Sequence, residues 1–190
     1  MPPAVLPKWY PAWFRLVFLA CLSCLAGFPL LAAEPVVAKE QQLKAAFLFN
    51  FTKFVEWPAG KFADANAPIR IGVLGSSSFG TAVAEAIKDR KVNGRELRFV
   101  PVNTVAEIKG LHALFVGVGE GEKLAGLGAA LTAGCVLGVG ESESFLRQGG
   151  TILLALEGDK VRFEIDLNCA ERAHLKISAQ LLKLARAVRK

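Results

Sequence analysis

Short apolar runs alternate with amphipathic stretches through most of this chain, and this alternation restricts the fold more than any other feature of the sequence. The runs have the length and β-branched content of buried strands, and the stretches between them carry helical spacing. Such a chain is expected to form a largely parallel sheet. The expected strands are residues 69–74, 96–102, 111–118, 135–139, 151–156 and 161–167.

Cap and turn residues separate these elements. Thr104 and Glu107 have the spacing of a capping box, and Ser142 is placed to cap a single helical turn. The segment 157–160 has the composition of a hairpin connection between the last two strands. We therefore expect a single-domain α/β sandwich with a largely parallel central sheet, an antiparallel hairpin near the C-terminus and helices on both faces.

The stretch 39–58 predicts one amphipathic helix that ends at Trp57 and Pro58, because proline disfavours the helical conformation of the residue before it. Four phenylalanines in eight residues are too many for a narrow seam. Either this helix packs on more than one side, or part of its aromatic surface contacts a partner. The expected apolar stripe is Leu43, Ala46, Phe47, Phe51, Phe54 and Val55, with Asn50 inside it and Lys44, Thr52 and Glu56 on other faces.

The end of the chain predicts a single long helix that begins at Asn168 or Cys169. Its cations suit the negative end of the helix dipole, so we interpret them as a solvated face and do not expect nucleic-acid binding. The expected apolar face of this helix is Leu175, Ser178, Leu181, Leu182, Ala185 and Val188.

The first 33 residues have the pattern of a secretory signal peptide, with Lys8 and Arg15 before the apolar run 16–31 and small residues at Ala32 and Ala33. We expect cleavage near Ala33 and a single domain of residues 34–190. Cleavage would remove two of the 23 basic residues and no acidic one, so the net charge would fall from +6 to +4.

Two alternatives to cleavage stay open. An uncleaved membrane anchor is one, although the apolar run is short for a membrane span and carries Pro29. Lipidation at Cys21 or Cys24 is the other, although the residues before both cysteines are poor surroundings for it.

Cys135 and Cys169 are the cysteines that would remain after cleavage. In an oxidising compartment a pair of cysteines is more often a disulfide than a metal site, so we expect a bridge. Two buried free thiols are the alternative.

Catalytic and metal-binding patterns are weak in this sequence. Neither His112 nor His174 has a further ligand at metal spacing, and no nucleophile motif accompanies them. The segment 117–121 is rich in glycine, but its spacing differs from that of a dinucleotide loop. We therefore expect no enzymatic activity, no metal and no cofactor.

The motif KAAFLFNFTKFVEWP resembles the opening of the YfiR family of small exported proteins. The resemblance continues through IGVLGSSSFG, LHALFVGV, GGTILLALEGDKVRFEIDLN and LKISAQLLKLA, in the same order. It implies a periplasmic protein that binds the periplasmic sensor domain of an inner-membrane diguanylate cyclase. In that family, binding represses the cyclase, and release raises cyclic-di-GMP and favours biofilm. The family also implies homodimerisation, and no direct membrane insertion follows signal cleavage.

The residues 161–168 alternate strictly between apolar and charged side chains, which predicts an edge strand. Its charged face either faces water or contacts a partner, and arginine and tryptophan are enriched at binding hot spots. The candidate partner-binding residues are Asn50, Lys53, Trp57, Arg162, Glu164 and Asn168.

An alternative function is a ligand-binding accessory protein of another membrane receptor, such as a sensor histidine kinase. Its pocket would lie near the carboxyl ends of the parallel strands, at residues 75–79 and 117–121.

Overall fold

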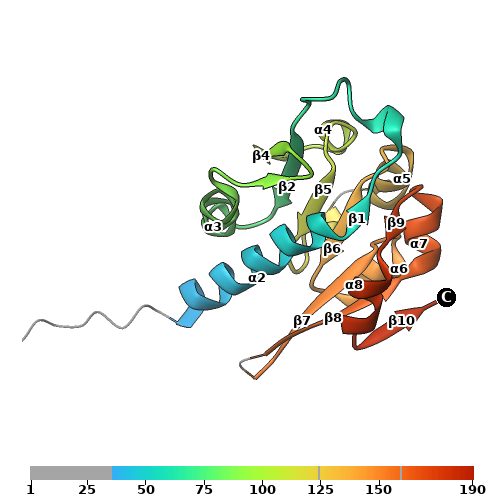
Figure 1. Ribbon diagram of the computed structural model, residues 1–190. Coiled ribbons are helices and arrows are strands. Elements are labelled where there is room, and N and C mark those ends of the chain that lie inside the picture. The colour runs from blue at the N-terminus through green and yellow to red at the C-terminus, as the bar shows by residue number, and fades with distance from the viewer. Residues whose placement is uncertain (1–35, 124, 159) are drawn as a thin grey trace, which may run out of the picture. The chain divides into compact units, whose positions relative to one another are not determined.

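An eight-stranded sheet, in the order β10-β8-β7-β6-β5-β2-β4-β3, forms the centre of the fold (Figure 1). The computed structural model describes residues 36–123, 125–158 and 160–190. The neighbouring pairs from β7 through β6, β5 and β2 to β4 are parallel, and β7 pairs with β8 as an antiparallel hairpin. This confirms the expected α/β fold with a largely parallel sheet. Its strands are β2 (Ile69–Leu74), β3 (Lys91–Val92), β4 (Arg95–Pro101), β5 (Ala113–Val116), β6 (Leu137–Gly140), β7 (Ile152–Glu157), β8 (Lys160–Asp166) and β10 (Ala187–Arg189).

Two hydrophobic cores lie on opposite faces of this sheet because alternate residues of a strand point to opposite sides. In β5, Ala113 and Phe115 belong to the first core, and Leu114 and Val116 belong to the second. The first core is covered by α2 (Val36–Lys53), α3 (Ser77–Ile87), α7 (Leu167–Arg172) and α8 (Ala179–Leu184). The second is covered by α4 (Val105–Ile108), α5 (Leu127–Ala133) and α6 (Glu143–Arg147).

The local sequence signals act as expected at two helix starts. Thr104 and Glu107 form the capping box of α4, and the Ser142 hydroxyl accepts the Phe145 backbone N–H at 3.2 Å. Asn93 and Gly94 have φ values of 51° and 80°, which a two-residue hairpin between β3 and β4 requires.

The predicted end of the first helix is wrong. α2 ends at Lys53, and the next residues form β1 (Val55–Glu56), which pairs antiparallel with β9 (Lys176–Ile177). The backbone hydrogen bonds of β1 therefore go to β9 and do not extend the helix. A short 3₁₀ turn, η2 (Ala59–Lys61), follows β1.

The buried face of α2 differs from the predicted apolar stripe. Leu43 is 37% exposed and Asn50 is exposed, whereas Thr52 is fully buried. The Thr52 hydroxyl donates to the Phe49 carbonyl at 2.6 Å, so its burial leaves no polar group unpaired. α2 packs against α3 as well as the sheet, and for this reason its buried surface is wider than one stripe. The buried residues are Ala45, Leu48, Phe49, Phe51 and Thr52.

The prediction of a single C-terminal helix is also wrong. α7 ends where His174 adopts a left-handed conformation with φ of 55°, and β9 follows it. The Ser178 hydroxyl then accepts the Leu181 backbone N–H and begins α8. β10 pairs parallel with β8, so β8 lies inside the sheet and is not the expected edge strand.

Candidate functional site

Two of the candidate residues, Asn50 and Lys53, lie together on the exposed side of α2. The Lys53 ammonium donates to the Asn50 side-chain oxygen at 3.0 Å. Lys53 also lies over the Phe49 ring at 4.2 Å, and the Arg90 guanidinium lies over the same ring at 4.7 Å. Cation–π contacts hold both cations beside the end of α2. We call Asn50, Lys53 and Arg90 the basic surface.

Trp57, in contrast, is turned into the protein. Its indole N–H donates to the His112 carbonyl at 2.9 Å, and its ring meets Phe62 and His112 edge-on at 6.4 and 5.8 Å. The polar end of the indole is thus already paired. This geometry favours a structural role for Trp57.

The candidates on β8 face away from α2. Phe163 contacts Phe51 and Phe47 of α2, with ring centroids 5.1 and 6.4 Å apart. Since neighbouring residues of a strand point to opposite faces, Arg162 and Glu164 lie on the other side of the sheet. The structure therefore does not bring the six candidates into one surface. Asn168, which is exposed, lies beyond β8 in α7.

Glu164 is 5% exposed and lies between two arginines of the last segment of the chain. Arg189 donates to its carboxylate at 2.6 and 3.1 Å, and Arg186 donates to its other oxygen. Hydrogen bonds from Arg189 and Arg186 lower the pKa of the Glu164 carboxyl group despite its burial. The sequence prediction missed both arginines because it placed them on a solvated helix.

The two arginines also reach glutamates outside β8. Arg189 forms a forked pair with Glu143 at 2.9 and 3.1 Å, and Arg186 pairs with Glu157. β10 is therefore joined to both strands of the hairpin and to α6. This arrangement is a structural network in which each carboxylate already has a cation.

A crevice lies where the order of the parallel strands changes direction. The chain leaves β2 through α3 on one face, and leaves β5 through α5 on the other, so their carboxyl ends separate. A cavity of about 320 Å³ lies there. Its lining includes Gly75, Ser76, Phe79, Gly117 and Val118, all of which fall within the two segments expected for the alternative function.

α2 closes one side of this crevice through Lys44. The Lys44 ammonium pairs with Glu141, which follows β6, and with Glu40 of α2. Burial alone would lower the pKa of Lys44, but hydrogen bonds to the two glutamates raise it. The crevice thus contains paired charges of both signs.

Cys135 and Cys169 are free thiols in the structure, so the predicted disulfide is not formed. Cys135 precedes β6 and Cys169 follows β8, with β7 between these strands. Cys169 is instead buried in α7, where it accepts a hydrogen bond from Arg172 at 3.0 Å.

The described part of the chain contains no group of three or more histidine, cysteine or acidic side chains that could hold a metal ion. Within the same residues, no helix is both long and apolar enough to cross a membrane. The predicted signal peptide lies outside the described residues.

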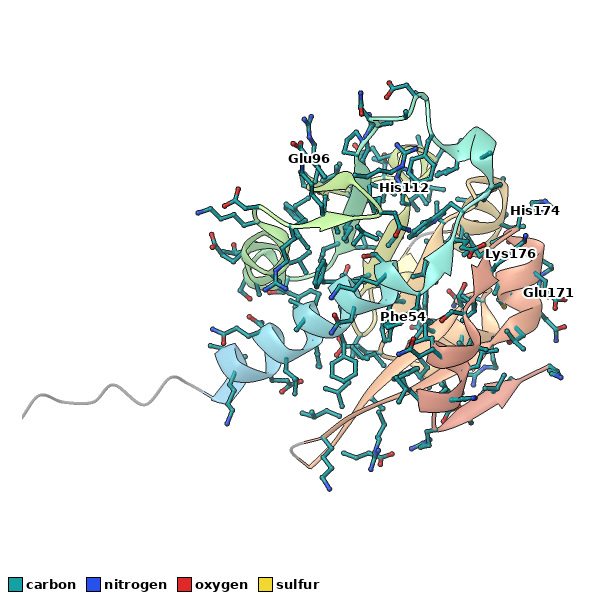
Figure 2. All side chains as sticks on the ribbon, in the orientation of Figure 1. Phe54, Glu96, His112, Glu171, His174 and Lys176 are labelled. Atoms are coloured by element: carbon teal, nitrogen blue, oxygen red, sulfur yellow. The ribbon has the colours of Figure 1, made fainter. Side chains whose placement is uncertain are left out.

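The strands β1 and β9 form a second, two-stranded sheet near the end of α2, where Phe54 and Lys176 lie (Figure 2). The family model described as YfiR/HmsC-like (DUF4154) matches residues 41–186. The chain therefore belongs to the YfiR/HmsC-like family, whose members are periplasmic regulators without catalytic activity.

Two solved structures are similar to parts of this chain. One is a conserved domain protein from Vibrio cholerae O1 biovar El Tor, 11% identical, with a TM-score of 0.46, covering 63% of this chain and 54% of that one. The other is the ABC domain in complex with L-Trp from Streptococcus pneumonia, 14% identical, with a TM-score of 0.48, covering 76% and 60%. This chain thus spans less than two thirds of either structure, and neither carries an argument about its function.

Proposed function

We propose that this chain is a periplasmic repressor of an inner-membrane diguanylate cyclase. It binds the periplasmic sensor domain of the cyclase, keeps cyclic-di-GMP low and limits biofilm formation. Membership of the YfiR/HmsC-like family over residues 41–186 is the observation that carries this proposal. Export, with cleavage near Ala33, and homodimerisation belong to the same proposal.

The mechanism is a population shift. A repressor that binds the inactive conformation of the sensor domain more tightly than the active one moves the cyclase toward the inactive state. A tenfold shift requires a difference in binding free energy of about 1.4 kcal/mol between the two conformations. Binding alone, with equal affinity for both conformations, would repress nothing.

The basic surface is the part of the molecule that we assign to the cyclase. Asn50, Lys53 and Arg90 are exposed, and each of the two cations lies over the Phe49 ring. Oriented cations of this kind favour an acidic partner, because complementary charge speeds association and fixes register. Trp57 and Glu164 have their polar groups paired within the protein, so they are weaker candidates.

The test is capture by the periplasmic domains of the host's membrane cyclases. We expect the purified protein to bind a cyclase domain, and the double variant Lys53→Glu, Arg90→Glu to bind it at least about tenfold more weakly. Arg147→Glu is the matched control, because Arg147 is an exposed cation in the last turn of a helix on the opposite face. Equal weakening by the control would contradict the assignment of the basic surface.

The crevice favours a second candidate function, a ligand-binding accessory protein of another membrane receptor. Its cavity of about 320 Å³ lies at the strand ends where ligands bind in related sheet topologies. Capture of a sensor-kinase domain without any cyclase domain would favour this function over repression. Ser76→Trp, which fills the crevice but leaves the basic surface intact, would then abolish the response to ligand.

A further inference from the structure

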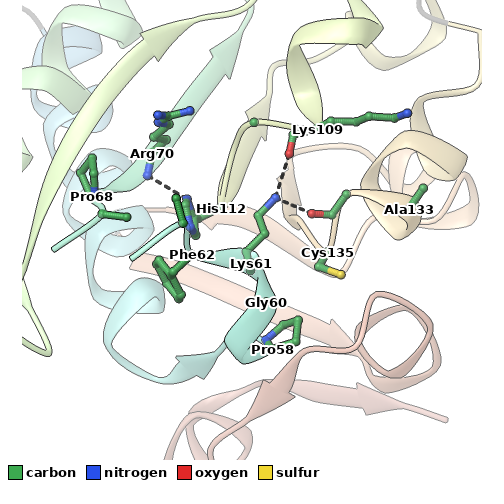
Figure 3. A pocket seen from close by; sticks show the side chains of 14 residues that line it. Pro58, Gly60, Lys61, Phe62, Pro68, Arg70, Lys109, His112, Ala133 and Cys135 are labelled. Atoms are coloured by element: carbon green, nitrogen blue, oxygen red, sulfur yellow. Dashed lines mark hydrogen bonds between the residues drawn. The ribbon is translucent and has the colours of Figure 1, made fainter. Parts of the chain in front are cut away.

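A second cavity, of about 500 Å³, lies at the amino ends of the parallel strands, the end of the sheet opposite to the crevice (Figure 3). The segment 58–68 covers it, and the residues that precede β5 and β6 form its floor. We call it the Lys61 pocket. Its lining includes Lys61, Phe62, Arg70, Lys109, His112 and Gly134.

The Lys61 pocket carries positive charge without a carboxylate among its described lining residues. Lys61, Arg70 and Lys109 all line it. The Lys61 ammonium donates to the Lys109 carbonyl at 2.9 Å and to the Gly134 carbonyl, which leaves one of its three N–H groups for another acceptor. Burial is the largest cause that lowers the pKa of Lys61, and the nearby Arg70 lowers it further.

His112 supplies a buried donor that is not used. The ring is 4% exposed, and its Nδ1 accepts the Arg70 backbone N–H at 3.1 Å. The neutral ring therefore carries its proton on Nε2, which has no hydrogen-bond partner among the described residues. Burial and the nearby cations lower the pKa of His112 to about 4, so the ring is neutral at pH 7. A buried N–H without an acceptor is costly, and such a group marks a place for a ligand oxygen.

Phe62, an aromatic side chain that lines the pocket, already makes ring contacts within the protein. Phe62 stacks on His112 at 4.5 Å, and the Arg95 guanidinium lies over Phe62 at 3.9 Å. Because His112 and Arg95 already lie against its ring, Phe62 has little free ring surface on which a flat ligand could stack. Recognition in this pocket therefore depends on charge and hydrogen bonds.

We infer that the Lys61 pocket binds a small oxyanion with two or more negative charges, of the class of di- and tricarboxylates and phosphate esters. The ligand oxygens accept from the free N–H of Lys61 and from the guanidinium and ammonium of Arg70 and Lys109. A further oxygen accepts from Nε2 of His112. Figure 3 shows the Lys61 ammonium between the His112 ring and the Lys109 carbonyl group. Its hydrogen bonds to the Lys109 and Gly134 carbonyl groups hold the cation in the pocket.

The test uses calorimetric titration of the purified protein with citrate and, separately, with glycerol phosphate, at constant ionic strength. Saturable binding of either compound is expected, with glycerol as the neutral compound that does not bind. Arg70 and Lys109 are exposed, so Arg70→Gln and Lys109→Gln should fold and should each weaken binding about tenfold. Lys88→Gln, an exposed cation of the α3 end, should leave the affinity unchanged.

The two histidines of the chain give a second measurement by NMR. Saturation with the bound anion should shift the ring signals of His112 and leave those of His174, which lies in the turn after α7, in place. The inference is overturned if neither anion binds, if both glutamine variants bind as tightly as the unmodified protein, or if the His112 signals do not move.

Discussion

Replacement of Phe51 with alanine is expected to lower the free energy of unfolding by about 3–5 kcal/mol. Phe51 is 1% exposed, and its ring meets Phe47 and Phe163 edge-on, with centroids 6.1 and 5.1 Å apart. It thus joins α2 to β8 across the first core. Truncation would leave a cavity that the surrounding sheet and helices cannot fill, and would also remove two aromatic contacts.

Leu43→Ala is the control for this prediction. The sequence places Leu43 and Phe51 in the same apolar stripe, but the structure leaves Leu43 37% exposed. We expect Leu43→Ala to cost less than about 1 kcal/mol. Denaturant unfolding of both variants measures the difference, and similar losses would contradict the observed orientation of α2.

Replacement of Glu164 with glutamine is expected to lower the free energy of unfolding by about 2 kcal/mol at pH 7. The variant keeps the size of the side chain but removes the charge that Arg186 and Arg189 share. The loss is smaller than for a fully buried ion pair, because both arginines are about half exposed and water can reach them. β10 should detach from β8 more readily, and hydrogen exchange of β10 would report it.

The effect of this substitution should depend on pH. The pKa of Glu164 is lowered in the folded protein, so its contribution to stability is complete above the unfolded value, about 4.3. It is lost as the pH falls through the folded value. The difference between the two proteins should therefore shrink below about pH 4.

Glu157→Gln is the matched control, since Glu157 pairs with the same Arg186 but is half exposed. Its expected cost is below about 1 kcal/mol. A difference between Glu164→Gln and the unmodified protein that stays constant down to pH 2 would contradict the account of the Glu164 network.

The central sheet could be predicted from the sequence because its signals are local. Each of these signals determines the conformation of the backbone close to it, and each predicted element appears in the structure. The signals are the apolar runs of β2 and β5, the capping box at Thr104 and the hairpin at 157–160. The order of the strands depends on long-range pairing, which periodicity does not encode.

The two ends of the described chain could not be predicted in the same way. Val55 and Glu56 have helical spacing relative to α2, but pairing with Lys176 and Ile177 draws them into β1. Val188 fits the apolar face of the helix that was predicted at the end of the chain. In the structure it belongs to β10 instead, because β10 pairs with β8. In both places tertiary contacts override the local pattern.

The candidate site was predicted only in part. The sequence placed Asn50 inside an apolar stripe, whereas the structure leaves Asn50 and Lys53 exposed. Arg90 joins them only through the packing of α3 on α2. The alternation in β8 indicated correctly that Glu164 and Phe163 face opposite ways. The Lys61 pocket was missed because Lys61 lies 48 residues before Lys109 in the chain. The only local signal was a histidine, His112, at the start of an apolar strand.

The most direct test of the proposed function measures cyclic-di-GMP synthesis by the full-length captured cyclase in proteoliposomes. The sensor domain faces the added protein, and the catalytic domain is assayed on the other side. The account predicts that saturating protein slows synthesis at least about tenfold, and that Lys53→Glu, Arg90→Glu protein at the same concentration represses far less. Unchanged synthesis at saturating concentrations of a protein that binds the sensor domain would contradict repression.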